Sequence, residues 1–349
     1  MNPKHIQQIL TDQAFPDIKG TAELIETHIS WVILTAHFAF KIKKPLKYPF
    51  LDFSTLDRRK FYCERELIIN RRLVKKMYLE VLPVREQNGK MMIGGQSGFI
   101  VDYAVKMKRQ DTSRQMNLLL EAGLVNEEDM RKLAEQIATF HARAEVIQTG
   151  FDLEAIQNDF ADISKVQPFL AIHLGEKVAG VIARAVDYSD HFLSSFANRF
   201  RERIQMGFTI DGHGDLHSKN IFLLENGSAI IFDCIEFSDH FRQVDVLNEL
   251  AFFGMDLDFY GRSDLEKAFL DAYFVRYPVL IHEDDWQIYH YYKLYRANVR
   301  VKINALKTMQ SPDEKEMLER MGLVKAYLSL LEKYLEGVRP LGVLVKYNR

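Results

Sequence analysis

The chain has 349 residues, enough for two domains or two lobes with a sizeable core. Its formal net charge of −2 gives no overall field that would attract nucleic acid or an anionic membrane. The two cysteines, Cys63 and Cys234, lie far apart in sequence, which favours a reducing compartment over a disulfide scaffold or a zinc site. Because we find no signal-peptide pattern and no apolar run of roughly 18–20 residues, we expect a cytoplasmic protein without a membrane span.

The first elements are a short helix at residues 3–13 and three strands within residues 21–44. In the third strand, apolar residues alternate with Ala39, Lys41 and Lys43, so both lysines lie on one face. Ala39-Phe40-Lys41 matches the A-x-K of the third strand of protein kinases, where the lysine pairs with the nucleotide phosphates and with a helix glutamate. Lys41 is our candidate for this role and Lys43 is the rival. The alternative is a solvated lysine on an edge strand.

No G-x-G-x-x-G pattern precedes Lys41. The turn at residues 27–30 would therefore have to cover the phosphates with its backbone N–H groups and hydroxyls. This departure weakens the interpretation as a protein kinase.

A helix is expected over residues 55–76, with Ser54 as its cap and Asp57 three residues later. Glu66, near the middle of this helix, is the candidate partner of Lys41, and Glu64 is the alternative. If neither pairs with the lysine, both are surface charges. The apolar positions expected to be buried are Phe61, Leu67, Ile68 and Leu73.

Strands follow at residues 79–86, 91–95 and 99–107, and the first two are joined by an Asn88-Gly89 turn. Residues 108–111 are then expected to connect two lobes. A helix is predicted to begin at Asn126, with Asp129 three residues later. Its positions Met130, Leu133, Ile137 and Phe140 are expected to be buried, and His141 is expected to be a packed residue and not a ligand.

The segment at residues 213–233 reads HGDLHSKNIFLLENGSAIIFD, in which His213, Asp215 and Asn220 form H-x-D-x-x-x-x-N. In kinases an Asp at this position accepts the proton of the substrate hydroxyl, and an Asn five residues later holds Mg²⁺. A second Asp, at the end of a strand, holds the metal that bridges the nucleotide phosphates, and Asp233 follows a short apolar run in this way. The two apolar runs are separated by a Glu225-Asn226-Gly227 turn, which predicts a hairpin. The alternative is that these polar residues only cap turns and end strands.

HGDLHSKNI resembles the catalytic loop of the aminoglycoside phosphotransferase-like enzymes, which are small-molecule kinases of the protein-kinase-like fold. The resemblance implies Asp215 as the base and Asn220 and Asp233 as Mg²⁺ ligands, with His213 supporting the loop. It also places the adenine against the backbone near Met107.

Two features lie downstream of Asp233. The family's R-x-x-D pattern is matched by Arg242 and Asp245, so the resemblance gives Asp245 a supporting role beside the catalytic loop. Asp233 is followed by Cys234-Ile235-Glu236 and not by Phe-Gly. We interpret Glu236, Asp256 and Asp258 as a solvated acidic rim.

The fold implied is α+β and protein-kinase-like. An N-terminal nucleotide-binding lobe, residues 1–107, would hold an antiparallel sheet and a helix. A larger, mostly helical catalytic and substrate-binding lobe would follow at residues 108–349.

The C-terminal third is expected to be helical, with Lys293, Arg296 and Arg300 on one face and Tyr295 beside them. Such a basic stripe suits a substrate that bears phosphate or carboxylate, which makes Arg296, Arg300 and Tyr295 candidate substrate residues. The alternative is a solvated helix face.

These observations favour an ATP- and Mg²⁺-dependent phosphotransferase that acts on a hydroxyl of a small molecule, which is sugar-like, aminoglycoside-like or anionic. One alternative is a metal-dependent phosphohydrolase that uses His213, Asp215 and His217. Another is a non-catalytic, nucleotide-binding regulator. The acceptor and the choice between ATP and GTP stay open at this point.

Overall fold

The protein is described by a computed structural model that covers residues 1–18, 20, 22–311 and 313–337. It contains two packing units. Unit 1 consists of residues 1–125 and 212–243, and unit 2 of residues 126–211 and 244–349, of which the structure describes residues 126–211, 244–311 and 313–337. The HGDLHSKN segment therefore belongs to the same unit as the N-terminal sheet. The lobe boundary at residues 107 and 108 stays a prediction, because a packing unit and a lobe are different divisions of the chain.

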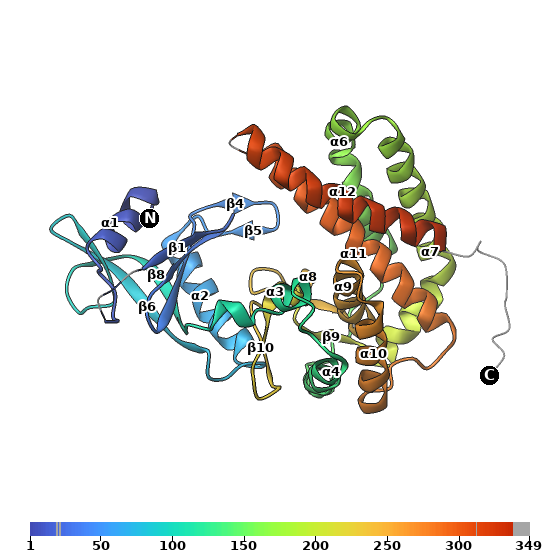
Figure 1. The fold of residues 1–349 in the computed structure, drawn as a ribbon, viewed down its shortest axis with the longest axis horizontal. Coiled ribbons are helices and arrows are strands. Elements are labelled where there is room, and N and C mark those ends of the chain that lie inside the picture. The colour runs from blue at the N-terminus through green and yellow to red at the C-terminus, as the bar shows by residue number, and fades with distance from the viewer. Residues whose placement is uncertain (19, 21, 312, 338–349) are drawn as a thin grey trace. The chain divides into compact units, whose positions relative to one another are not determined.

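Unit 1 is built on a six-stranded sheet in which neighbouring strands run antiparallel (Figure 1). The strand order is β1-β2-β3-β8-β6-β7. This arrangement confirms the predicted strands and the hairpin turn at residues 88–89. The strands are β1 (Glu23–Glu26), β2 (Ser30–Leu34), β3 (Phe38–Lys43), β6 (Tyr78–Gln87), β7 (Lys90–Ile93) and β8 (Phe99–Lys108).

The two faces of this sheet differ in what covers them. Phe40 and Ile42 pack in a cluster with residues of helix α1 (Pro3–Thr11) on one face. Ala39, two residues before Lys41, packs with Cys63 of helix α2 (Leu56–Asn70) on the other face. Because side chains alternate along a strand, Lys41 and Lys43 also lie on the α2 face, as the sequence pattern predicted.

Helix α2 differs from its predicted form. Its cap is Thr55, whose hydroxyl accepts the Arg58 N–H, whereas Ser54 is bonded to Asp52. Phe61 and Ile68, which were expected to be buried, are exposed.

The buried face of α2 is polar, which explains why the apolar pattern misplaced it. Glu66 and Asn70 are completely buried on it, and Arg59 is 5% exposed. Arg59 donates to the buried Asp102 on β8 at 2.8 Å. The helix thus packs partly through paired charges, which a hydrophobic periodicity does not report.

The rest of unit 1 consists of short elements. The predicted hairpin after Asn220 is present as strands β10 and β11, which pair antiparallel. The elements are β4 (Lys47–Tyr48), β5 (Leu51–Asp52), η1 (Thr112–Arg114), α3 (Met116–Glu121), η3 (Ser218–Asn220), β10 (Ile221–Leu223), β11 (Ala229–Ile231) and α8 (Asp239–Arg242).

Unit 2 is mainly helical. The short strand β9 pairs with β12, and α12 packs along α11 (Figure 1). Among the described residues no helix is both long and apolar enough to cross a membrane. The elements are α4 (Glu127–His141), α5 (Leu153–Ala161), η2 (Asp162–Lys165), α6 (Gln167–Leu174), α7 (Lys177–Gln205), β9 (Thr209–Asp211), β12 (Gln243–Asp245), α9 (Val246–Phe259), α10 (Ser263–Arg276), α11 (Asp284–Met309) and α12 (Glu314–Gly337).

Helix α4 begins as predicted. Asn126 and Asp129 form a reciprocal capping box, and Met130, Leu133 and Ile137 are buried. Phe140 is only half-buried, so that expectation was wrong. His141 is buried and bonded to Glu249 at 2.9 Å and to the Tyr273 hydroxyl at 2.7 Å, which agrees with a packed residue.

A buried ionic network ties α7 to the start of α11. The Asp285 carboxylate accepts from Arg199 at 2.8 and 2.9 Å and lies 3.0 Å from Arg203. It also accepts the N–H groups of Ile281 and His282. Burial alone would raise the pKa of Asp285, but these hydrogen bonds and charges hold it below its ordinary value.

We expect Asp285→Asn to destabilise the protein by about 3–5 kcal/mol, because it leaves two buried arginines short of a counter-charge. Asp284→Asn, at the half-buried neighbouring position, should change stability by no more than about 0.5 kcal/mol. Chemical denaturation of both variants measures the difference. Equal, small effects would contradict the importance of the network.

Candidate active site

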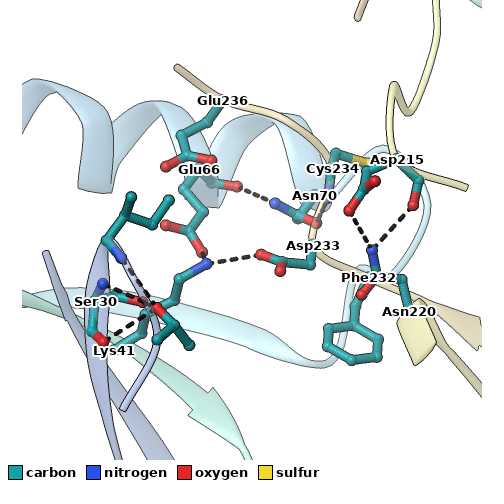
Figure 2. Close-up of polar contacts among 12 residues, drawn as sticks. Ser30, Lys41, Glu66, Asn70, Asp215, Asn220, Phe232, Asp233, Cys234 and Glu236 are labelled. Carbon is teal, nitrogen blue, oxygen red and sulfur yellow. Dashed lines mark hydrogen bonds and ion pairs between the residues drawn. The ribbon is translucent and has the colours of Figure 1, made fainter. Parts of the chain in front are cut away.

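Lys41 and Glu66 form an ion pair inside unit 1. The Lys41 ammonium lies 2.8 Å from Glu66 Oε1 and 2.7 Å from Asp233 Oδ1 (Figure 2). Glu66 has no solvent exposure, whereas the Asp233 side chain is 44% exposed. The lysine, the helix glutamate and the aspartate after the hairpin therefore meet, although they are far apart in sequence.

Lys43 takes the second oxygen of the same carboxylate. Its ammonium lies 2.7 Å from Glu66 Oε2 and also contacts Glu236 Oε1. Glu66 thus lies between two lysines that are two residues apart on β3. With the half-exposed Asp233 included, the group contains two ammonium ions and three carboxylates, which gives a formal net charge of −1.

The pKa values follow from these neighbours. Burial would raise the pKa of Glu66, but the two lysines lower it to about 2. Burial raises the pKa of Glu236 above its ordinary value; Lys43 opposes this rise, and the nearby Glu66 carboxylate adds to it. For Lys41, the carboxylates of Asp233 and Glu66 outweigh burial and raise its pKa well above the ordinary value.

The expected acidic rim is not present. Glu236 and Asp256 are each 3% exposed, and the Asp258 side chain is 6% exposed. Glu236 pairs with Lys43, and Asp258 pairs with Lys293 at 2.7 Å. The expectation was wrong because a run of acidic residues in sequence does not reveal lysines that approach from other elements.

Asp233 has a left-handed backbone conformation with φ of +64°. This region is unfavourable for a residue with a side chain and persists only where neighbouring groups fix the chain. Four consecutive N–H groups are fixed here. The N–H of Phe232 donates to the Asn220 carbonyl, and the N–H of Asp233 donates to the Tyr78 hydroxyl. The N–H of Cys234 donates to the Asn70 side chain, and the N–H of Ile235 donates to the His213 carbonyl. The four distances lie between 2.9 and 3.2 Å.

Residues of the HGDLHSKN segment also meet. The Asn220 amide nitrogen donates to the backbone carbonyl of Asp215 at 2.9 Å and to its carboxylate at 3.1 Å (Figure 2). His217 Nε2 lies 3.2 Å from the same carboxylate. Because Asn220 donates through its nitrogen, its amide oxygen is the atom suited to a cation.

Gly214 explains the H-G-D variant of the loop. Its φ is +84°, and a Cβ at this position would approach the Phe241 carbonyl oxygen to 2.7 Å. A side chain is therefore excluded on two grounds. Arg242 supports the segment after Asp233 by donating to the Ile235 carbonyl at 2.8 Å.

His213 supports the loop through both ring nitrogens. Its Nδ1 accepts the Asp215 N–H at 3.2 Å, so its Nε2 carries the proton and donates to the Phe232 carbonyl at 2.9 Å. Neither nitrogen is then available to a metal. Within residues 1–18, 20, 22–311 and 313–337, no group of three His, Cys, Asp or Glu side chains is arranged to hold a metal ion.

Met107 lies in β8 between Ala39 of β3 and Tyr78 of β6. The Arg109 N–H donates to the His37 carbonyl, so these two residues form a hydrogen-bonded pair between β8 and β3. Because hydrogen-bonded pairs recur at every second residue of an antiparallel ladder, Met107 and Ala39 form the next one, and the backbone groups of Met107 face β3. A base near Met107 would therefore meet the backbone beyond the end of β8. The buried side chain of Met107 packs in an apolar cluster with Ala39, and the partly buried side chains of Val32, Ile230 and Phe232 adjoin this cluster.

The turn at residues 27–30 is held by its own side chains. The Thr27 hydroxyl oxygen accepts the N–H groups of Ile29 and Ser30 at 3.3 and 2.9 Å. These two N–H groups are therefore already bonded, so the expectation that the backbone N–H groups of this turn bind phosphates is not met at Ile29 and Ser30. Lys44 donates to the Thr27 carbonyl at 2.6 Å.

The basic residues of α11 are in unit 2. Lys293 binds Asp258 and Glu266, and Arg296 is 8% exposed, donates to Asn248 at 2.6 Å and lies over the Phe252 ring. A solvated helix face is therefore wrong as a description of this stripe. The substrate role of Arg296, Arg300 and Tyr295 stays a prediction. Arg300 is partly buried over Phe252, and the Tyr295 ring packs near Phe160.

Asp245, expected beside the catalytic loop, is bonded within unit 2. Its carboxylate accepts two hydrogen bonds from Arg203, at 2.7 and 2.8 Å, and caps α9 by accepting the Leu247 N–H. Its supporting role at the loop stays a prediction.

Sequence reasoning missed Asn70, Tyr78 and the Lys43–Glu236 pair. One usable signal was the spacing of Glu66 and Asn70, which puts both on one face of α2. Tyr78 and Glu236 carried no such signal, because their partners come from other elements.

No protein-family model matches the chain. Uncharacterized proteins of Mycobacterium tuberculosis and Mycobacterium bovis are 32% identical to it over 313 residues, which is 87% of this chain and 58% of theirs. The chain thus spans about 58% of the length of these curated relatives.

Solved structures match nearly the whole chain. A microcompartment-associated aminopropanol kinase matches with a TM-score of 0.53, at 13% identity over 96% of this chain and 98% of that one. A choline/ethanolamine kinase family protein from Mesorhizobium loti matches with a TM-score of 0.50, at 13% identity over 95% and 100%. The chain has the fold of the small-molecule kinases. The predicted α+β, protein-kinase-like architecture and the resemblance to small-molecule phosphotransferases are confirmed at the level of the fold.

We expect Glu66→Gln to destabilise the protein by about 3–5 kcal/mol near neutral pH, because both lysines lose a buried counter-charge. The pKa of Glu66 is lowered on folding from 4.5 to about 2, so its ionisation stabilises the fold above pH 4.5 and ceases to do so as pH falls toward 2. The difference between wild type and variant should shrink over that range in denaturation experiments. Glu64→Gln, at an exposed position of the same helix, is the control.

Proposed function

We propose that the protein is an ATP- and Mg²⁺-dependent phosphotransferase that transfers the γ-phosphoryl group of ATP to a hydroxyl of a small molecule. Two contacts of the Asp233 segment carry this proposal. The Asp233 carboxylate meets the Lys41–Glu66 pair, and the backbone beside Asp233 is hydrogen-bonded to the loop that holds Asp215 and Asn220. The fold shared with small-molecule kinases supports it.

Asp215 is the residue proposed to accept the proton of the acceptor hydroxyl. Its side chain is 38% exposed, so a substrate can reach it, while Asn220 and His217 orient its carboxylate. Phosphoryl transfer depends mainly on such positioning and on neutralising charge at the transferred group.

Lys41 is proposed to bind the α- and β-phosphates, with Glu66 fixing its direction. The Asp233 carboxylate points to Lys41 here (Figure 2), and nucleotide phosphates would replace it as the anionic partner. The apolar cluster with Ala39 and Met107, and the partly buried Val32, Ile230 and Phe232 that adjoin it, supplies a surface of the kind that a purine base requires. Backbone groups after β8 would bind the edge of the base.

Mg²⁺ fits the residues present. One carboxylate and one amide oxygen, from Asp233 and Asn220, are hard oxygen donors, and Mg²⁺ commonly takes few protein ligands beside phosphates and water. When bound, the ion would neutralise charge on the nucleotide phosphates. Asp233 and Asn220 would hold it, and the hydrogen bonds at residues 232–235 would keep Asp233 in place.

The acceptor is proposed to be a small hydroxylated metabolite. The two structural neighbours are named for aminopropanol and for choline or ethanolamine, which are small amino alcohols. Sugar-like, aminoglycoside-like and anionic acceptors belong in the same screen, the last because of Arg296, Arg300 and Tyr295. The cytoplasm, where ATP is available, is the proposed location.

We expect wild type to consume ATP with Mg²⁺ only in the presence of a suitable acceptor, and Asp215→Asn to lower kcat by about 10²–10⁴-fold because the general base is lost. Nucleotide binding should be retained, since Asp215 is proposed to contact the acceptor and not the nucleotide. A coupled assay for ADP over an acceptor panel, with Asp271→Asn as an exposed control, measures this. An Asp215→Asn variant with wild-type turnover would refute the assignment.

A further inference from the structure

Lys43 and Glu236 form a buried pair that the proposed reaction leaves unused. Lys43 is 1% exposed and Glu236 is 3% exposed, and the two are 193 residues apart in sequence. The pair joins strand β3 to the segment that follows Asp233. Lys43 also lies over the Phe53 ring, at 4.8 Å from its centre.

The Lys43–Glu236 pair and the Lys41–Asp233 pair share one residue, Glu66. Lys43 binds Glu66 Oε2, while Lys41 binds Oε1 of the same carboxylate. The contacts therefore run in series from Asp233 to Lys41, Glu66, Lys43 and Glu236. Because Asp233 and Glu236 are three residues apart, the two ends of this series lie on one short segment.

We propose that Lys43 and Glu236 are positioning residues that hold both Glu66 and the Asp233 segment in their working places, whether or not nucleotide is bound. This proposal rests on the proposed function, and it assigns neither residue a contact with substrate.

The reason lies in the demands on Lys41. In this structure the Lys41 ammonium pairs with the carboxylates of Glu66 and Asp233 at the same time. A lysine that turns toward nucleotide phosphates neutralises Glu66 less well, and Glu66 has no exposure to water that would compensate. Lys43 supplies a second cation that stays with Glu66 throughout.

Glu236 fixes the other end of the series. Asp233 has a strained backbone, and a strained residue holds its conformation only where the surrounding contacts determine it. The main-chain hydrogen bonds fix residues 232–235, and the Lys43 contact fixes residue 236 to the sheet. Asp233 is thereby anchored to β3 through a bond that does not involve its own carboxylate.

The test uses Lys43→Met, Glu236→Gln and their combination in the full chain. The matched control is Lys106→Met with Glu80→Gln, an ion pair at 3.0 Å on the opposite face of the same sheet, whose glutamate is half exposed. Two readouts are needed. Hydrogen exchange of the amides at residues 232–236 reports the anchoring without any substrate, and steady-state kinetics reports the effect on catalysis.

We expect each single substitution to accelerate exchange at residues 232–236 by about tenfold or more, because local opening becomes easier. The value of kcat should fall by about 10–100-fold from misplacement of Lys41 and Asp233, while KM for the acceptor changes little. The double variant should lose less than the product of the two single losses, because the two residues act together. The control pair should change neither readout.

Faster exchange with unchanged kcat would mean that the pair is only structural, and would overturn the proposal. A fall in kcat without faster exchange would also overturn it, because the residues would then act directly and not by anchoring. If wild type fails to turn over nucleotide with any acceptor, the proposed function fails, and unchanged exchange in the variants would separately exclude the anchoring.

Discussion

A single carboxylate, that of Glu66, determines how unit 1 is assembled around the candidate site. It has no exposure to water and is neutralised by ammonium groups on both oxygens. This requires two lysines at alternate positions of β3, which the period-two geometry of a strand provides. It also requires a helix that turns a charged face to the sheet, so α2 buries Glu66, Arg59 and Asn70 and exposes Phe61 and Ile68. Without the ion pairs, that face would be costly to bury.

The same constraint extends to the segment that carries Asp233. Asn70, one helical turn after Glu66, donates to the Glu66 carbonyl and accepts the Cys234 N–H. The Tyr78 hydroxyl accepts the N–H of Asp233 itself, and His213 donates to the carbonyl of the preceding residue, Phe232, so the left-handed conformation of Asp233 is determined from several directions. These bonds fix the backbone at Asp233, while its carboxylate is 44% exposed and pairs with Lys41.

Much of this site could be predicted from sequence, and the reasons are specific. The spacing of Asp215 and Asn220 is local, and so are the hairpin and the β3 alternation, so short-range patterns report them. The Lys41–Glu66 pair was predicted because a strand lysine and a helix glutamate are a known combination. Glu236 was misread because its partner, Lys43, comes from a distant strand. The face of α2 was misread because apolar periodicity assumes an apolar core.

Nucleotide binding at Asp233 is tested by calorimetric titration of the full chain with ATP, in Mg²⁺ and in excess chelator, for wild type and Asp233→Asn. Asn accepts the left-handed conformation at residue 233, so the variant keeps the fold while losing the carboxylate charge. We expect one nucleotide to bind per chain in Mg²⁺, with an affinity that falls at least about tenfold, or about 1.4 kcal/mol, in chelator or in the variant. Absence of binding, or equal binding in all three cases, would contradict a phosphotransfer site at Asp233.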